Sequence, residues 1–314
     1  MRLLMIGCSV LTLVITWSGC QSFGLGQSYP AVVELQPSGT FEIATSPTLR
    51  LAQLVAANGA VYFLERSNTD AEIVKTDTTG RFIAAIKVPT DVSQVIVEDS
   101  NNIIALGKTR LGQRILDIEP SGVVKRETQL QRKVYRIATS GGRIVGWDEG
   151  EIFLQPGESG GLSIASTVAL PSHAATLPGG RLAIIGAERP ALWILRASGN
   201  VSQQVPLVAP EMKSETRTQQ GVKHLTIFSV ASNHNGEIFC TVSPYRGAEG
   251  GIVLEFDSNG VLKNRFRIAL PMFPETEGRR DGRMTLSHIA VVNRTLFIGS
   301  TSEQRCVYYR LPVQ

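Results

Sequence analysis

The stretch Asn58-Gly59-Ala60-Val61-Tyr62-Phe63-Leu64 starts with a turn pair and continues as an apolar strand. Asn-Gly is a preferred turn between antiparallel strands, because both residues tolerate a positive φ. Further segments of this form begin at Asn101, Gly141, Gly179, Asn235 and Asn293. They recur at intervals of roughly 40 to 60 residues, close to the length of a four-stranded propeller blade.

A second turn containing glycine follows each of the first five segments. These turns are Thr78-Thr79-Gly80, Pro120-Ser121-Gly122, Ser159-Gly160-Gly161, Ala197-Ser198-Gly199 and Ser258-Asn259-Gly260. An outer strand such as 82–86 or 261–266 then completes each unit. The sequence therefore predicts an all-β fold, a six-bladed β-propeller with four antiparallel strands in each blade. Counts of five and seven blades stay open, because the two longest intervals have room for partial units.

The last unit contains only three predicted strands and ends near Leu311-Pro312. Residues 41–45 alternate between apolar and polar side chains, as a strand does. We expect this N-terminal strand to supply the missing outer strand and to close the ring, which would leave no exposed sheet edge at the junction.

The composition favours one large domain, which we place at residues 41–314. The chain has 314 residues, 43% of them hydrophobic, and a formal net charge of +4. The basic residues are scattered and form no stripe, which argues against a nucleic-acid partner. We expect a monomer.

Residues 1–19 have the composition of a secretory signal peptide. Arg2 precedes an apolar run from Leu3 to Trp17, and small residues follow it. Residues 20–40 are rich in Gly, Ser, Gln and Pro, so they are predicted to form a flexible tether.

Ser18-Gly19-Cys20 resembles the lipobox of bacterial lipoproteins and departs from it at Trp17, where that motif usually has Leu. The resemblance implies lipidation of Cys20 and anchoring in a membrane. Gln21 stands where Asp would signal retention at the inner membrane, so the resemblance implies an outer-membrane anchor facing the periplasm or the surface. An ordinary secretory leader, cut nearby, is the alternative.

Two cysteines remain in the predicted domain, Cys240 and Cys306. Export would permit a disulfide between them, but their apolar strands favour two buried free thiols. No spacing of Cys or His suits a metal, so the sequence gives no reason to expect a metal or another cofactor. No residue is assigned a catalytic role.

Polar residues recur near the start of the predicted first strand in five of the six units, and this strand lines the channel of a propeller. These candidates for a ligand-binding mouth are Gln53, Tyr135, Arg136, His173, His224 and His288. Histidine changes its charge near neutral pH and binds ligands, although ordinary strand ends also carry such residues.

Two long insertions, 206–223 and 271–284, precede the last two units. Both should emerge beside the same mouth. Arg279, Arg280 and Arg283 offer guanidinium groups for carboxylates or phosphates, so this face is predicted to bind a protein or an envelope polymer.

The repeat pattern over residues 41–314 resembles propellers of the NHL type, and its length resembles six-bladed lactonase-type hydrolases. The latter resemblance implies Glu, Asn and Asp side chains around a divalent metal in the channel. This chain places Gln, Tyr, Arg and His there instead. The sequence therefore favours a non-catalytic binding or scaffolding propeller of the cell envelope. A hydrolase, a lactonase-like enzyme or a ligand sensor with its site at the channel mouth is the alternative.

Overall fold

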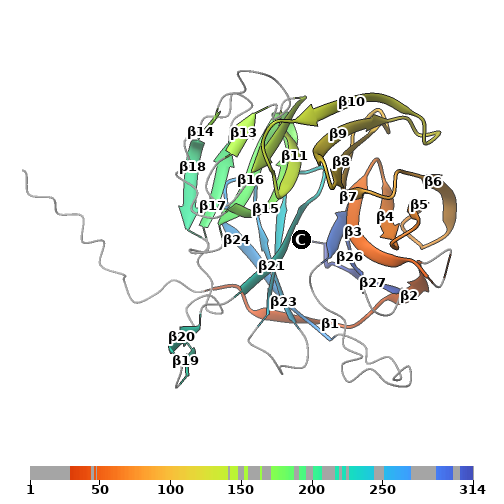
Figure 1. Cartoon of the computed structure of the whole chain (residues 1–314). Coiled ribbons are helices and arrows are strands. Elements are labelled where there is room, and N and C mark those ends of the chain that lie inside the picture. The colour runs from red at the N-terminus through yellow and green to blue at the C-terminus, as the bar shows by residue number, and fades with distance from the viewer. Residues whose placement is uncertain are drawn as a thin grey trace, which may run out of the picture.

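The computed structural model describes residues 29–43, 46, 48–140, 142–147, 152–154, 163–164, 171–186, 191–195, 201–206, 216–218, 221–223, 226–243, 251–269, 288–299 and 305–313. Within them, strands form seven sheets, and the six larger ones follow one another in chain order around a central channel (Figure 1). We call these sheets blades 1 to 6. The predicted six-bladed β-propeller with antiparallel blades is confirmed.

The first three blades have four strands each. Blade 1 contains β3 (Arg50–Ala57), β4 (Ala60–Arg66), β5 (Ala71–Thr76) and β6 (Phe82–Lys87). Blade 2 contains β7 (Val92–Val97), β8 (Ile103–Thr109), β9 (Gly112–Ile118) and β10 (Val124–Leu130). Blade 3 contains β11 (Arg136–Ser140), β12 (Arg143–Trp147), β13 (Ile152–Leu154) and β14 (Ser163–Ile164).

Blade 4 follows the same plan, whereas the outermost strands of blades 5 and 6 come from the N-terminal segment. Blade 4 contains β15 (Pro171–Leu177), β16 (Arg181–Gly186), β17 (Ala191–Leu195) and β18 (Val201–Pro206), with a 3-10 turn (Pro178–Gly180) after β15. Blade 5 contains β21 (Thr226–Ser232), β22 (Ile238–Ser243), β23 (Gly251–Phe256), β24 (Leu262–Ile268) and β1 (Val32–Leu35). Blade 6 contains β25 (Ile289–Val292), β26 (Thr295–Gly299), β27 (Arg305–Arg310) and β2 (Gly39–Glu42).

The first strand of each blade faces the channel. These inner strands contact one another in the cyclic order β3, β7, β11, β15, β21, β25 and back to β3, so the ring has no gap. Apolar side chains fill the space between neighbouring blades. Tyr62 and Leu64 pack with Val95 and Leu116 between blades 1 and 2, while Phe63 packs with Phe297 between blades 6 and 1. A blade has two apolar faces, and only its neighbours can cover both.

The predicted turns have the backbone that tight hairpins require. Asn58 and Gly59 have φ values of 51° and 71°, as both central residues of a type I′ turn do. The second turn of each of three blades has a left-handed glycine, with φ of 86° at Gly80, 89° at Gly122 and 82° at Gly260.

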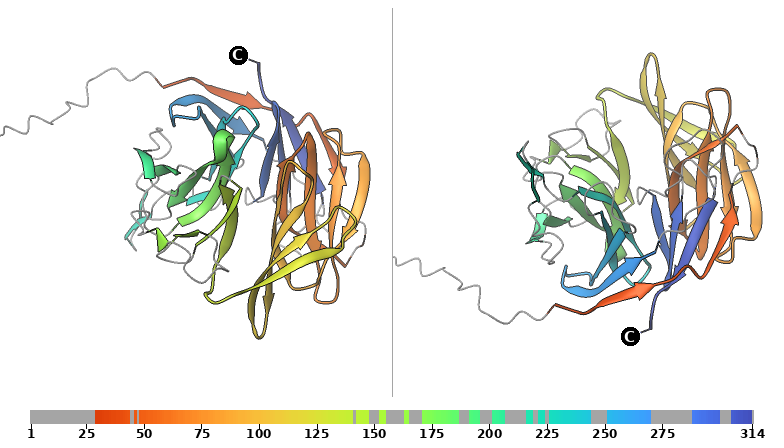
Figure 2. Two further views of the ribbon diagram at one scale, coloured as in Figure 1. Left: turned by 90° about the horizontal axis from the view of Figure 1, so that it is seen from above. Right: turned by 90° about the horizontal axis from the view of Figure 1, so that it is seen from below.

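The N-terminal segment contributes strands to two blades. β2 lies at the outer edge of blade 6, antiparallel to β27, with Phe41 opposite Cys306. The sequence predicts this position for a strand at residues 41–45. The observed strand starts two residues earlier, at Gly39. Figure 2 shows β1 and β2 running along one side of the ring, beside the C-terminus. The contribution of this pairing to ring closure stays a prediction.

β1 corrects one expectation. Residues 20–40 were expected to be a flexible tether, but Val32–Leu35 pair in parallel with β24 along Arg265–Ile268. Leu35 is buried in the core between blades 5 and 6, and this burial favours a strand in a segment of mostly turn-forming composition. The signal peptide lies outside the described residues. None of the described helices is long and apolar enough to cross a membrane.

Two further features bear on the sequence analysis. The insertion at 206–223 contains a short hairpin of β19 (Thr216–Thr218) and β20 (Gly221–Lys223). Cys240 and Cys306 are buried free thiols, and burial raises the pKa of each. The thiolate is the reactive form, so these two side chains serve as small apolar groups of the core.

Candidate functional site

One level of the channel collects a polar residue from each blade. Each of these residues lies three or four positions before the end of its inner strand, His288 just ahead of β25 and the others within theirs. We call this set the mouth ring: Gln53, Gln94, Arg136, His173, Ser229 and His288.

Local backbone geometry places four of these residues. The pairing register of β3, β7, β15 and β21 with the next strand shifts directly before Gln53, Gln94, His173 and Ser229. Such a bulge adds one residue to a strand and redirects the side chains next to it. The same irregularity therefore recurs at the same level in four blades.

The two glutamines of the mouth ring join neighbouring blades. Nε2 of Gln53 donates to the Val95 carbonyl at 3.0 Å, and its Oε1 accepts from the Val95 amide at 2.6 Å. Nε2 of Gln94 donates to the Ile137 carbonyl at 2.8 Å, and its Oε1 accepts from the Ile137 amide at 2.9 Å. Inner strands are sheet edges, and these carboxamides satisfy main-chain groups that face the channel. Gln53, predicted as a ligand-binding residue, thus has its carboxamide occupied by Val95.

Arg136, His173 and His288 are the titratable members of the mouth ring. Desolvation lowers the pKa of His173 to about 3, and the charges of Arg136 and His288 add to the effect. Desolvation lowers the pKa of His288 to about 4, again with a contribution from Arg136. The three side chains are therefore close enough to act on one another, and both imidazoles are neutral at pH 7.

Arg136 is exposed to the channel, yet the surrounding protein desolvates its guanidinium and lowers its pKa. Among the described residues, no carboxylate lies within ion-pair distance of it. Other cations lie nearby. Desolvation lowers the pKa of Lys108, and the positive charges of Arg136, Lys133 and Arg66 lower it further. This side of the mouth is positively charged and suited to an anion.

The other predicted residues are placed as follows. Tyr135 directly precedes β11, and the Lys133 amine lies 5.3 Å from its ring centroid. His224, Cys20 and the three arginines Arg279, Arg280 and Arg283 lie outside the described residues. Gln94 and Ser229 are not among the residues predicted from the sequence. They lie at nearly the same distance before the turn as the predicted residues, so counting backward from each turn identifies them.

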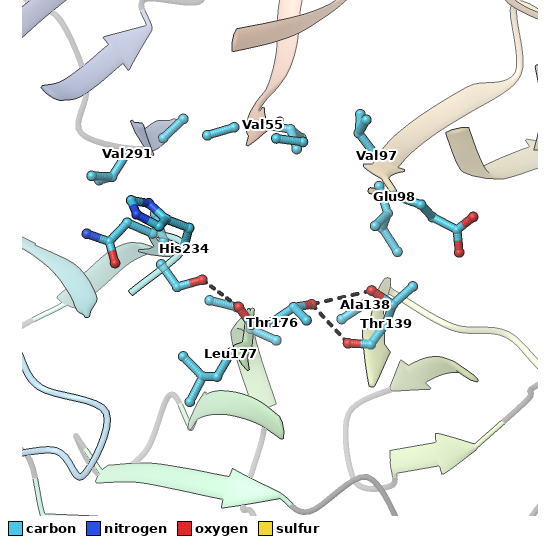
Figure 3. Close-up of a pocket in the computed structure, with 18 of the residues that line it drawn as sticks. Val55, Val97, Glu98, Ala138, Thr139, Thr176, Leu177, His234 and Val291 are labelled. Atoms are coloured by element: carbon cyan, nitrogen blue, oxygen red, sulfur yellow. Dashed lines mark hydrogen bonds between the residues drawn. The ribbon is translucent and has the colours of Figure 1, made fainter. Parts of the chain in front are cut away.

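A cavity of about 830 Å³ occupies the channel on the other side of this level, where the inner strands turn into the second strands. Figure 3 shows Val291, Val55 and Val97 along one side of it and Thr139, Thr176 and Leu177 along the opposite side. Hydrogen bonds link the polar side: Ser232 Oγ donates to the Thr176 carbonyl at 2.6 Å, and Thr176 Oγ1 donates to the Thr139 carbonyl at 2.9 Å. No sequence pattern indicates this cavity, since small and β-branched residues are ordinary in strands.

The described residues do not fit the divalent metal that lactonase-type propellers imply. Ca²⁺ takes six or more oxygen ligands, mostly carboxylates and carbonyls. The mouth ring has no carboxylate, its two carboxamide oxygens already accept hydrogen bonds, and Arg136 would repel a cation. No three His, Cys, Asp or Glu side chains among the described residues are grouped as a metal site requires.

No protein-family model matches the chain, and no curated protein matches it by sequence. Solved structures do resemble it. A streptogramin B lyase has 15% identity and a TM-score of 0.51, with 88% of each chain covered. A calcium-binding regucalcin from Agrobacterium tumefaciens has 12% identity and a TM-score of 0.54, covering 90% of this chain and 98% of its own. A putative gluconolactonase has 14% identity and a TM-score of 0.54, covering 89% and 96%.

These structures correct the expectation of a non-catalytic scaffolding propeller. Lyase and lactonase are names of enzymes, so this fold gives no support to a non-catalytic role. At these identities the likeness establishes the fold alone. The chain shares the β-propeller fold of lyases and gluconolactonases.

Proposed function

We propose that this protein is a small-molecule enzyme that uses the channel mouth at Arg136, His173 and His288 to open an ester or lactone bearing a carboxylate. One observation carries the proposal: a desolvated guanidinium without a carboxylate partner among the described residues lies beside two neutral imidazoles. Arg136 would bind the substrate carboxylate. A neutral imidazole would accept a proton from the water that attacks the carbonyl carbon and would return it to the alkoxide oxygen as the acyl C–O bond breaks, which leaves an acid and an alcohol.

The substrate itself strengthens the base. An imidazole with a pKa near 3 or 4 is a weak base at pH 7, and Arg136 is one cause of that low value. A carboxylate bound to Arg136 would offset its charge and raise the pKa of both imidazoles in part, because desolvation, the larger cause of the low values, would remain. An anionic substrate would thereby make each imidazole a stronger base.

The experiment measures acid release from paired esters and lactones, each with and without a carboxylate. We expect turnover of the carboxylate-bearing members. Arg136→Gln should lower kcat/KM for them by at least tenfold and leave the neutral members unchanged, while His288→Gln should lower kcat. Arg143→Gln is the matched control, because it removes an exposed charge from the other end of the same blade. Absence of turnover across the panel, or equal rates in both variants and wild type, would overturn the proposal.

A further inference from the structure

Two lysines lie beside Arg136 on the mouth side of the ring. Lys108 is the last residue but one of β8, which runs antiparallel to β7 and therefore ends where β7 begins, at the mouth. Lys133 lies three residues before β11. Figure 1 shows β8 and β9 of blade 2 next to β11 of blade 3. Both lysine side chains are exposed, so a ligand in the mouth can reach them.

Hydrogen bonds between blades 2 and 3 hold the two lysines near each other. Lys108 is paired with Gln113 across the β8–β9 ladder. Nε2 of Gln113 donates to the Val134 carbonyl at 2.9 Å, and its Oε1 accepts from the Val134 amide at 2.6 Å. Val134 directly follows Lys133 and lies two residues before Arg136. Gln113 thus fastens the segment that leads into β11 to the strand pair that carries Lys108.

The pleat of β8 directs the Lys108 side chain toward blade 3. Ile104 and Leu106 pack with Ile137 in the core between blades 2 and 3. The pairing of β8 with β9 has no register shift, so Lys108 lies on the same face of the sheet as these two residues. The lysine therefore extends that face at the mouth, above the apolar contact.

The carboxylates at this end of blade 2 do not neutralise the two lysines. Arg114 donates to both oxygens of Asp91, at 2.9 and 2.8 Å, and to Glu127 at 2.8 Å. Successive residues of a strand point to opposite faces, so Arg114, which follows the residue paired with Lys108, lies on the face turned away from blade 3. Among the described residues, neither Lys108 nor Lys133 forms an ion pair.

The charge of the two lysines suits a phosphate group. A lysine ammonium is a compact point charge that binds phosphate, whereas the planar fork of Arg136 matches a carboxylate. A phosphate monoester carries a charge of about −1.5 to −2 at pH 7, so it can compensate two ammonium groups. The Lys133 amine lies 5.3 Å from the centroid of the Tyr135 ring, which restricts its position. Desolvation and neighbouring cations lower the pKa of Lys108, and a bound anion would offset both effects.

We propose that Lys108 and Lys133 form a second anion subsite of the mouth, which binds a phosphate group of the substrate while Arg136 binds its carboxylate. This inference rests on the proposed function and names the substrate class: an ester or lactone that carries both a carboxylate and a phosphate monoester. The phosphate takes no part in the reaction and stays attached. Two anchored anions fix the position of the ester carbonyl relative to His173 and His288.

The first test measures binding and needs no turnover. Calorimetry with inorganic phosphate at about pH 8, where the ion is mainly a dianion, gives the dissociation constant. The double variant Lys108→Gln/Lys133→Gln should weaken binding at least tenfold. Lys75→Gln is the matched control and should bind like wild type, because the Lys75 amine also lies over a tyrosine ring, 5.2 Å from the Tyr62 centroid, but on the third strand of blade 1.

The second test uses pairs of carboxylate-bearing esters and lactones that differ only in a phosphate monoester. We expect the phosphate to lower KM at least tenfold for wild type and for Lys75→Gln, with little change in kcat. The double variant Lys108→Gln/Lys133→Gln should lose this difference between the members of a pair. Equal phosphate affinity in the double variant and wild type, no binding to wild type at millimolar phosphate, or an unchanged KM ratio in the double variant would overturn the subsite.

The subsite and the proposed activity fail separately. An absence of turnover across the whole panel would remove the activity, whereas phosphate binding that depends on Lys108 and Lys133 would still show an anion subsite. Turnover of carboxylate-bearing members at rates that do not respond to the phosphate would keep the activity and remove the subsite.

Discussion

Arg294 donates from both guanidinium NH groups to the two carboxylate oxygens of Glu255, whose side chain is only 1% exposed. Arg294 lies in the first turn of blade 6 and Glu255 in the third strand of blade 5, so the pair joins two blades. The same guanidinium also bonds Glu237 and the Pro312 carbonyl. Removing the bidentate partner of a buried carboxylate lowers the free energy of unfolding much more than removing the partner of an exposed carboxylate.

We therefore expect Arg294→Met to lower the free energy of unfolding by about 3 kcal/mol, because it leaves a buried charge uncompensated. Arg267→Met is the control, since Arg267 pairs with Glu34 at 3.2 Å while both side chains are more than half exposed. That variant should cost less than about 1 kcal/mol. Urea unfolding measures the free energy of unfolding of both variants. Equal decreases would contradict the stronger contribution expected of the Arg294–Glu255 pair.

The histidines of the mouth ring should make stability depend on pH. Their folded pKa values, about 3 and about 4, lie below the ordinary 6.5, so the unfolded state binds more protons in between. Stability from this source is complete above pH 6.5 and falls as the pH drops toward 4, with a slope of about 1.4 kcal/mol per pH unit for each imidazole. The double variant His173→Gln/His288→Gln should show a shallower decline between pH 6.5 and 4.5. A decline as steep as that of wild type would refute the low pKa values.

Arg136→Gln should raise both histidine pKa values, because it removes a neighbouring positive charge. NMR titration of the imidazole signals measures this directly. Arg143→Gln, at the far end of the blade, should leave them in place. Unchanged values in Arg136→Gln would mean that the guanidinium is too distant to tune a base.

Pairing of β2 with β27 is expected to hold the two ends of the chain together. Phe41 packs at 5.8 Å from the Phe63 ring and 6.4 Å from the Tyr308 ring, so β2 also contacts blade 1. Deletion of residues 39–43 should lower the melting temperature strongly, since it exposes an edge of blade 6 and part of the core. A melting temperature equal to that of the full chain would show that the ring closes without this strand.

Lipidation of Cys20 is tested by Cys20→Ala in cells that receive labelled palmitate. Wild type should carry the label and sediment with membranes, because acyl chains stabilise anchoring by about 0.8 kcal/mol per buried CH₂. The variant should lose both properties. An unlabelled, soluble wild-type protein would favour the ordinary secretory leader.

The sequence predicts the blades well because tight turns depend on local chemistry. Asn58-Gly59 and Gly80 need positive φ, and such positions are visible without any tertiary information. Counting from those turns is enough to predict that Arg136, His173 and His288 lie together in the channel. The hydrogen bonds of Gln53 to Val95 could not be predicted, since they depend on a bulge and on the spacing of two blades. Thr139, Thr176 and Ser232 meet only because three strands converge on one axis.

The positions of β1 and β2 constrain how the chain assembles. Val32–Leu35 pair with Arg265–Ile268, and Gly39–Glu42 pair with residues of β27. During synthesis the first strands to leave the ribosome must wait unpaired until almost the whole polypeptide has been made. The last strand pairs to form are therefore those between residues farthest apart in the sequence, which slows folding. Until then the unpaired N-terminal strands can aggregate, and a chaperone would protect them.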